Sequence, residues 1–318
     1  MKMTKYVIKR IILMFFVFFV VTTICFMLVR LLPRELPQDK TLAQAIADRW
    51  NALGYNEPLL TQFAIYLKNI FTKFDFGTSW YIQFREPALN LLLSRLAPTV
   101  LVNTYSLLFS IPIGIMLGIY AAIKKNKWQD SLISTSVMVF VSVPSYVYAF
   151  LIQYFLCFRL KLFPVVMDAG TDYFSLRMLR SMFPAVLSLS LSSIAGYARF
   201  TRGELTEVLT GEYLLLARAK GLTRRQITYR HALRNAMVPI VPSIVSEVIA
   251  VLAGSLIIES IFVVPGVGAL YVNAITALDY NFFLLLSAFY TAIGLIAGLL
   301  VDLSYGFIDP RIRIGSKK

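Results

Sequence analysis

Long runs without a charged residue constrain the fold of this chain more than any other feature of its sequence. Five such runs occur, at residues 11–29, 96–123, 131–158, 181–198 and 280–301. Each has between 18 and 28 residues, and a helix needs about 20 mainly apolar residues to cross a bilayer. A sixth segment, from about Val238 to Phe262, is apolar but contains Glu247 and Glu259. We therefore predict an all-α, polytopic membrane protein with six transmembrane helices.

The composition supports this prediction. Hydrophobic residues make up 58% and charged residues 15% of the 318 residues, against roughly half and about a quarter in soluble domains. A soluble globule of this size could not bury so much apolar surface, so a disordered chain and a cytosolic enzyme are both excluded. Cys25 and Cys157 lie inside apolar runs and are expected to be small buried residues rather than a disulfide or a metal pair. The chain has one histidine, His231, and one is too few to form a histidine-based metal site.

The positions of the charged residues indicate the topology. The chain has 31 basic and 17 acidic residues and a net charge of +14, which in a soluble protein would suggest a nucleic-acid partner. Six spans place both termini on one side, and if that side is the cytoplasm, its segments hold 19 of the 31 basic residues. This bias agrees with the positive-inside rule. We therefore predict cytoplasmic termini and no nucleic-acid partner.

The first span follows a basic N-terminus, as the apolar part of a signal peptide would. Its apolar core is too long for a signal peptide and no small-residue cleavage site follows it. We interpret residues 1–30 as a cytoplasmic N-terminus and a retained first span.

The remaining chain divides into two predicted parts. Residues 31–97 form an extracytoplasmic segment of short helices, and residues 98–318 form the core with the other five spans. Apolar residues have helical spacing at Leu42–Leu53 and Leu59–Phe71, and the Gly-Tyr-Asn-Glu-Pro sequence between them indicates a turn. The many aromatic residues of 31–97 favour a folded cap over a disordered loop.

The cytoplasmic loop at about 200–238 is predicted to contain two short helices. The first is expected at about Glu212–Gly221, where Leu215, Ala219 and the following Leu222 have the spacing of one apolar helix face. Gly221 stands where a helix C-cap would, and Thr223 can cap a following helix that carries four arginines. A basic loop that only sets the topology or touches anionic lipid is the alternative. Two capped helices favour a docking element for a cytoplasmic partner.

The segment after the fifth span is predicted to turn sharply, because Pro265, Gly266 and Gly268 follow one another closely. The fifth span therefore ends there, and the chain re-enters the membrane surface before the sixth. Glu259 is expected to be structural and to anchor this turn. Glu247 lies inside a helix and has two interpretations, an interhelical hydrogen bond or a residue that lines a polar pathway.

The sequence lacks the motifs of an enzyme. There is no G-x-x-x-x-G-K-[ST] phosphate-binding loop, no H-E-x-x-H and no G-x-S-x-G. We therefore predict a non-catalytic protein that binds no metal or cofactor and does not bind ATP by a phosphate-binding loop.

Several motifs resemble one known family. They are Ala217–Leu222, Ile227, Arg230–Ala236 and Pro239 in the cytoplasmic loop, and, elsewhere, Asp75–Ser79, Arg199–Arg202, Glu259–Gly268, Asp279-Tyr280 and Asp309–Arg311. Together they resemble the permeases of ABC importers, in particular the B-type permease of the dipeptide/oligopeptide (peptide/nickel) group. The resemblance covers nearly the whole chain.

This resemblance implies the type I ABC importer permease fold in a bacterial or archaeal cytoplasmic membrane. It also implies a homologous C-type permease that supplies half of the pathway, two cytoplasmic ATPase subunits that bind ATP and magnesium, and an external binding protein that delivers a peptide. The residues similar to the ATPase-coupling helix and its end are Glu212, Tyr213, Ala217, Arg218, Ala219, Lys220, Gly221 and Leu222.

Two departures and several alternatives accompany the resemblance. Leu215 stands where the general importer motif has a glutamate, and Pro33-Arg34-Glu35 stands where the family often has Pro-Gly. The same group includes importers of nickel chelates, glutathione and oligosaccharides. An ion-coupled secondary transporter acting alone is a different class, which would show inverted repeats and ionisable groups at the bilayer midplane. A membrane-bound enzyme is disfavoured by the missing motifs.

Overall fold

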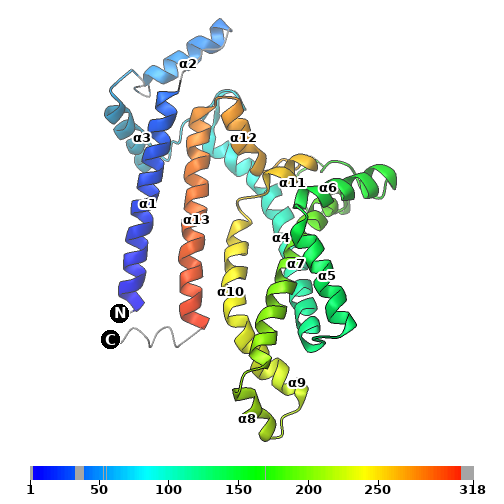
Figure 1. Ribbon diagram of the computed structural model, residues 1–318. Helices are drawn as coiled ribbons and strands as arrows, with labels where there is room; N and C mark the ends of the chain where they lie inside the picture. Colours follow the sequence, from blue (N-terminus) through cyan, green and yellow to red (C-terminus); the bar gives the residue numbers. More distant parts are fainter. Residues whose placement is uncertain (1–2, 33–38, 53, 55, 169, 309–318) are drawn as a thin grey trace. The chain divides into compact units, whose positions relative to one another are not determined.

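The chain folds into helices in this computed structural model, which describes residues 3–32, 39–52, 54, 56–168 and 170–308 (Figure 1). The α-helices are α1 (Met3–Leu31), α2 (Lys40–Ala52), α3 (Leu59–Lys73), α4 (Ala88–Ile123), α5 (Trp128–Ser142), α6 (Ser145–Ile152), α7 (Leu176–Leu209), α8 (Tyr213–Ala219), α9 (Arg224–Gln226), α10 (Leu233–Ala250), α11 (Leu256–Ile261), α12 (Gly268–Thr276) and α13 (Tyr280–Ile308). Two π-helical segments are η1 (Gln153–Arg159) and η2 (Ile227–Ala232). The strands β1 (Thr78–Ser79) and β2 (Glu86–Pro87) pair antiparallel. The all-α prediction is thus confirmed apart from this short ladder.

The chain is divided into two compact units. One unit contains residues 98–268 and the end of α13 from residue 297, and the other contains residues 4–97 and 269–296. In the second unit, α2 and α3 lie where the sequence predicts helices, with Gly54 in the left-handed region between them at φ +69°. Phe26 of α1 packs on Phe63 of α3 with ring centroids 5.2 Å apart.

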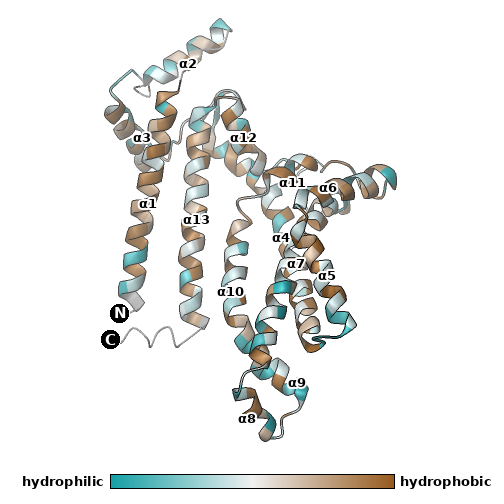
Figure 2. Cartoon of the chain, in the orientation of Figure 1, coloured by the Kyte–Doolittle hydropathy of each residue, from teal (hydrophilic) through white to brown (hydrophobic). Residues whose placement is uncertain are grey.

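Among the described residues, five helices are long and apolar enough to cross a membrane. They are α1, α4, α7, the continuous helix Arg224–Ala250 and α13, and the bent pair α5 and α6–η1 raises the number to six if it forms one span. Figure 2 shows apolar residues along most of α1, and Phe15, Phe16 and other apolar residues of that helix are exposed, as a lipid-facing surface would be.

The predicted span at 131–158 is present as a bent pair of helices. The helices on either side of Val143 and Pro144 meet at 98°. Proline has no backbone N–H and excludes helical geometry from the residue before it, and Val143 is accordingly extended, with ψ 126°. The uncharged run therefore contains two helices that point in different directions.

The span predicted from about Val238 to Phe262 is present with other bounds, as the helix Arg224–Ala250. The helix ends at Ala250 and a separate short helix, α11, begins at Leu256. Gly254 lies between them at φ +69°, a conformation that glycine adopts readily and that cannot continue a right-handed helix. The break predicted around Pro265 to Gly268 is present as well, so the fifth span is followed by two turns instead of one.

Close approach of α4 to α7 organises the first unit. A side chain added at Gly118 would place its Cβ 2.7 Å from the carbonyl oxygen of Ala198 and 2.6 Å from the Cβ of Thr201. The two helices pack closely here because Gly118 has no side chain. A buried cluster in the same unit includes Val102, Met178, Met182, Ile258 and Phe262.

Candidate functional site

The α8–α9 segment, residues 211–226, is held on the rest of its unit by two buried side chains. Leu214 is 1% exposed and Ala217 is 8% exposed. Both belong to a hydrophobic cluster that also contains Ile119 of α4, Leu205 of α7 and Ala236 of α10. A helix of only seven residues is not stable by its own hydrogen bonds and depends on packing. Burial of these two residues therefore stabilises α8 and fixes its orientation.

The predicted apolar face of this helix is wrong. Leu215 is 59% exposed and Ala219 is exposed, whereas Leu222 is half-buried. The buried residues are instead Leu214 and Ala217, which are three positions apart. Leu214, Leu215 and Leu216 are consecutive leucines, so hydrophobic spacing cannot tell which of them faces the core.

The exposed side of α8 is apolar, and we call Tyr213, Leu215 and Leu216 the α8 surface. These residues are 45%, 59% and 61% exposed. Neighbouring exposed hydrophobic groups of this kind are typical of an interaction site. Asn235 of α10 donates a hydrogen bond to the Tyr213 hydroxyl at 2.8 Å, which ties one edge of the surface to the long helix.

The end of α8 and the start of the next helix follow the sequence prediction. Gly221 has φ +78°, and Thr223 forms a capping box with Gln226, with the two hydrogen bonds at 3.3 and 2.9 Å. This cap starts a helix that continues without a break through η2 and α10 to Ala250. The α8 surface is therefore joined by one short turn to a membrane-spanning helix.

An ion pair that sequence reasoning missed braces the same end of the unit. Arg202 of α7 donates from Nε and Nη2 to the two carboxylate oxygens of Asp130 at 2.5 and 2.9 Å. Asp130 is 4% exposed and also accepts from the backbone N–H of Asn126 at 3.0 Å. The pair links the first turn of α5 to α7. The sequence signal for it is weak, because the partners are 72 positions apart.

Glu247 of α10 is shared with α7. Ser193 donates to one of its carboxylate oxygens at 2.7 Å, and the Tyr197 hydroxyl donates to the other. This geometry is the one that the interhelical hydrogen-bond interpretation requires. A role in lining a pathway stays a prediction.

Glu259 lies in the centre of the turn after α11 and is 2% exposed. It accepts hydrogen bonds from the Thr99 hydroxyl at 2.9 Å and from the backbone N–H groups of Gly268 at 2.8 Å and Ser255 at 3.4 Å. Gly266 has no room for a side chain, because a Cβ there would overlap both Glu259 and Thr99. Pro265 lies in the same turn, between Val264 and Gly266.

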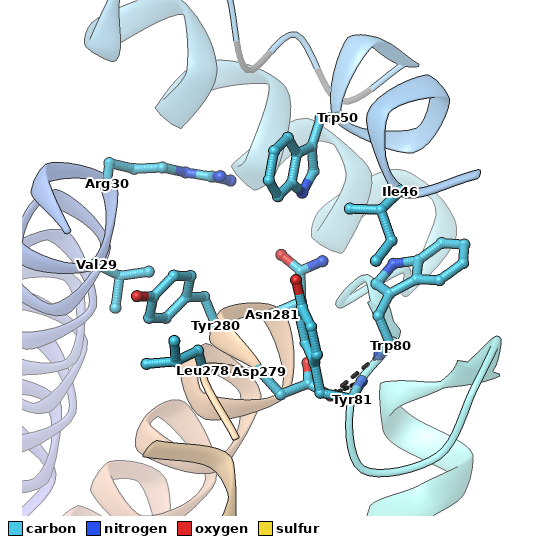
Figure 3. Close-up of a pocket in the computed structure, with 10 residues that line it drawn as sticks. All are labelled: Val29, Arg30, Ile46, Trp50, Trp80, Tyr81, Leu278, Asp279, Tyr280 and Asn281. Atoms are coloured by element: carbon cyan, nitrogen blue, oxygen red, sulfur yellow. Dashed lines mark hydrogen bonds between the residues drawn. The ribbon is translucent and has the colours of Figure 1, made fainter. Parts of the chain in front are cut away.

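In the second unit, Asp279 is likewise a buried carboxylate that accepts hydrogen bonds from a turn. It is 2% exposed and accepts from the Ser79 hydroxyl at 2.6 Å and from the backbone N–H of Trp80 at 3.1 Å (Figure 3). The N–H groups of Tyr81 and Ile82 also point to it, at 3.2 and 3.3 Å. The adjoining cavity has a volume of about 30 Å³, which is enough for one or two water molecules and too little for a transported solute.

These features define a multi-pass membrane protein with a short helix, α8, whose outer side carries exposed apolar residues. Its sequence matches a transport family. Residues 114–314 match the family described as "Binding-protein-dependent transport system inner membrane component", and residues 3–92 match the N-terminal component of such systems. The chain belongs to this family of membrane transport components.

Individual relatives and a solved structure agree with the family. The chain is 32% identical to the dipeptide transport system permease protein DppB of Lactococcus lactis subsp. cremoris, over 98% of this chain and 100% of that protein. It is 30% identical to the oligopeptide transport system permease protein OppB of Haemophilus influenzae, with the same coverage. A crystal structure of an amino acid ABC transporter with histidines shares the fold, with a TM-score of 0.50 and 19% identity over 68% of this chain and 94% of that chain.

Proposed function

We propose that this chain is the B-type permease subunit of an ATP-driven importer of short peptides in a bacterial cytoplasmic membrane, with both termini in the cytoplasm. The peptide substrate is supported by the names of the full-length relatives from Lactococcus lactis and Haemophilus influenzae, which are dipeptide and oligopeptide permeases. The orientation is supported by the basic residues, 19 of which lie in the segments assigned to the cytoplasm.

The α8 surface is the observation that carries the proposal. Its three apolar side chains are exposed on a helix whose opposite side is buried. We assign it to a groove of a partner ATPase, which binds ATP and magnesium. When the two ATPase subunits bind ATP and close, they would move α8 as a rigid element, because Leu214 and Ala217 are packed in the cluster between α4, α7 and α10.

The movement then reaches the membrane through the helix Arg224–Ala250, which begins at the Thr223 cap. A homologous C-type permease supplies the other half of the pathway, and an external binding protein delivers the peptide. The two permeases rock between inward-facing and outward-facing states. Glu247 holds α7 and α10 together during this motion, and the other proposed role, a polar lining of the pathway, predicts altered substrate selectivity in Glu247→Gln.

The docking assignment is tested with Leu216→Glu, which places a charge on the α8 surface without disturbing a buried residue. A leucine that becomes buried in a partner contributes about 1.5–3 kcal/mol, so we expect the ATPase subunits to be lost from the purified complex and ATP-dependent uptake of a labelled dipeptide to fall at least tenfold. Leu60→Glu on α3, where Leu60 is 77% exposed, is the matched control. Retention of the ATPase subunits and of uptake in Leu216→Glu would refute the docking assignment.

Substrate and energy source are tested separately. Uptake of the labelled dipeptide is measured in a deletion strain that carries the permease pair, with oligopeptides, glutathione, a nickel chelate or an oligosaccharide as competitor. Competition by peptides alone supports the proposal, and competition by another class reassigns the substrate within the same architecture. Uptake that persists without the ATPase subunits and follows an ion gradient would instead support an ion-coupled secondary transporter.

A further inference from the structure

A groove of about 610 Å³ opens beside the α8–α9 segment in the first unit. Its walls come from the end of α4 and the turn that follows, from α7, and from the segment between α8 and η2. The volume lies within the range of about 300–1,000 Å³ that is typical of small-ligand sites. The α8 surface does not line this groove, so the two features are separate.

The charge of the groove is of one sign. Its lining includes the five basic residues Lys124, Lys125, Lys127, Arg218 and Arg224, and no acidic residue. Among the described residues, the structure shows no ion pair for any of these five. Asp130 is the acidic residue of the adjacent helix, and it is already paired with Arg202. Five cations around one groove repel one another, and an anion bound between them would relieve that repulsion.

A hydroxyl group inside the groove supplies a hydrogen-bond donor. Three threonines line it, and two of them already donate to backbone carbonyls: Thr210 to Glu207 at 2.7 Å and Thr228 to Arg224 at 2.9 Å. The Thr206 hydroxyl oxygen is buried and has no hydrogen-bond partner in the described part of the chain. A buried polar group without a partner is costly, and a phosphate oxygen that reaches this hydroxyl would accept a hydrogen bond from it.

The depth of the groove identifies the source of that phosphate. The uncharged run of α4 ends at Ile123, and Lys124 follows it immediately, so the groove begins where the hydrocarbon core gives way to the headgroup layer. Ile123, Leu209 and Leu222 add apolar side chains to the lining. A lipid headgroup carries both a phosphate for the cations and a glycerol with its first methylene groups for this apolar lining.

We propose that this groove binds the phosphate of an anionic phospholipid headgroup. The lipid would hold the turn after α4 against α7 and the α8–α9 segment, and so would support the α8 surface from behind. This goes beyond the transport function proposed above and does not depend on the identity of the transported solute.

The experiment titrates the purified full-length chain in a zwitterionic detergent with short-chain phosphatidylglycerol, and counts bound lipid by native mass spectrometry. The variant Lys124→Gln/Lys125→Gln/Lys127→Gln is compared with wild type. Each basic residue near an anionic lipid surface contributes about a fivefold factor, so the triple variant should bind on the order of 100-fold more weakly. The matched control Lys5→Gln/Lys9→Gln/Arg10→Gln removes the same charge from α1 and should stay within about twofold of wild type.

A second variant separates a built site from a diffuse charge effect. Thr206→Val keeps the shape and the net charge but removes the hydroxyl. We expect a several-fold loss of phosphatidylglycerol binding, with a melting temperature of the lipid-free protein no lower than that of wild type. Because all these titrations need neither substrate nor ATP, their failure would leave the transport proposal intact.

Four results would overturn the proposal. Phosphatidylcholine could bind as tightly as phosphatidylglycerol, or the α1 control could lose as much affinity as the groove variant. Inorganic phosphate could displace phosphatidylglycerol at equal concentration, which would make the groove a site for free phosphate. In the assembled transporter, Lys125→Cys could cross-link to an ATPase subunit while lipid is excluded, which would assign the groove to a protein partner.

Discussion

Replacement of Glu259 should destabilise the first unit more than any change on its surface. Glu259 is 2% exposed, and it accepts hydrogen bonds from the Thr99 hydroxyl at 2.9 Å and from the Gly268 N–H at 2.8 Å. Hydrogen bonds to a charged group contribute about 1.5–3 kcal/mol each. Glu259→Ala removes both and leaves the Gly268 N–H buried without an acceptor, so we expect a loss of about 3–5 kcal/mol.

The side-chain amide of Glu259→Gln keeps one acceptor oxygen and has the same size. About half of the interaction should survive, so we expect a loss of about 2 kcal/mol. The exposed residue Glu207 provides the matched control, since Glu207→Gln makes the same chemical change where no side-chain contact is lost and should stay within about 0.5 kcal/mol of wild type.

The assay is the melting temperature of the purified protein in one detergent, followed by tryptophan fluorescence. For a chain of this size, 1 kcal/mol corresponds to about 2 °C, so Glu259→Ala should lower the melting temperature by about 6–10 °C and Glu259→Gln by about 4 °C. A melting temperature of Glu259→Ala within about 2 °C of the Glu207→Gln value would show that the turn does not depend on this carboxylate.

Two further predictions concern other close contacts. Gly118→Ala should separate α4 from α7 and lower the melting temperature, because its Cβ would lie 2.7 Å from the carbonyl oxygen of Ala198. The control is Gly203→Ala on α7, where the added Cβ would have no atom within 4 Å. This control should be neutral or stabilising by up to about 1 kcal/mol. Asp279→Asn should loosen the loop that hydrogen-bonds to it, and trypsin should then cleave after Arg85 faster than in wild type; equal cleavage rates would contradict this role for the carboxylate.

Local features of this chain could be predicted from the sequence because they depend on residues close together along it. The helices α2 and α3 and the Thr223 capping box lie where the spacing and the cap residues indicate. Pro144 also lies inside a predicted span, but the presence of a proline indicates only that the helix can bend there. The 98° bend depends on what the two halves pack against, and no window of residues contains that information.

The α8 helix shows the same limit at the candidate site. Its position, its end at Gly221 and its resemblance to a coupling helix could be predicted from the sequence. Its buried face could not, because three consecutive leucines satisfy more than one helical register. Leu214 is chosen by its contact with the cluster around Leu205, and that choice leaves Leu215 and Leu216 exposed for a partner.

The sequence by itself determined that this is a helical membrane protein, approximately where its spans lie, where its basic residues gather, and which family it resembles. Those properties depend on the free energy of transferring each hydrophobic segment into lipid and on the number of basic residues in each short loop. Both can be read from residues close together along the chain. Only the tertiary structure decided the partners of three acidic residues, of which Glu259 and Asp279 are buried and Glu247 is half-buried. Ser193 meets Glu247 across 54 positions, Thr99 meets Glu259 across 160, and Ser79 meets Asp279 across 200. Each carboxylate needs donors when it is buried, but which donors it finds is set by how distant helices and turns pack.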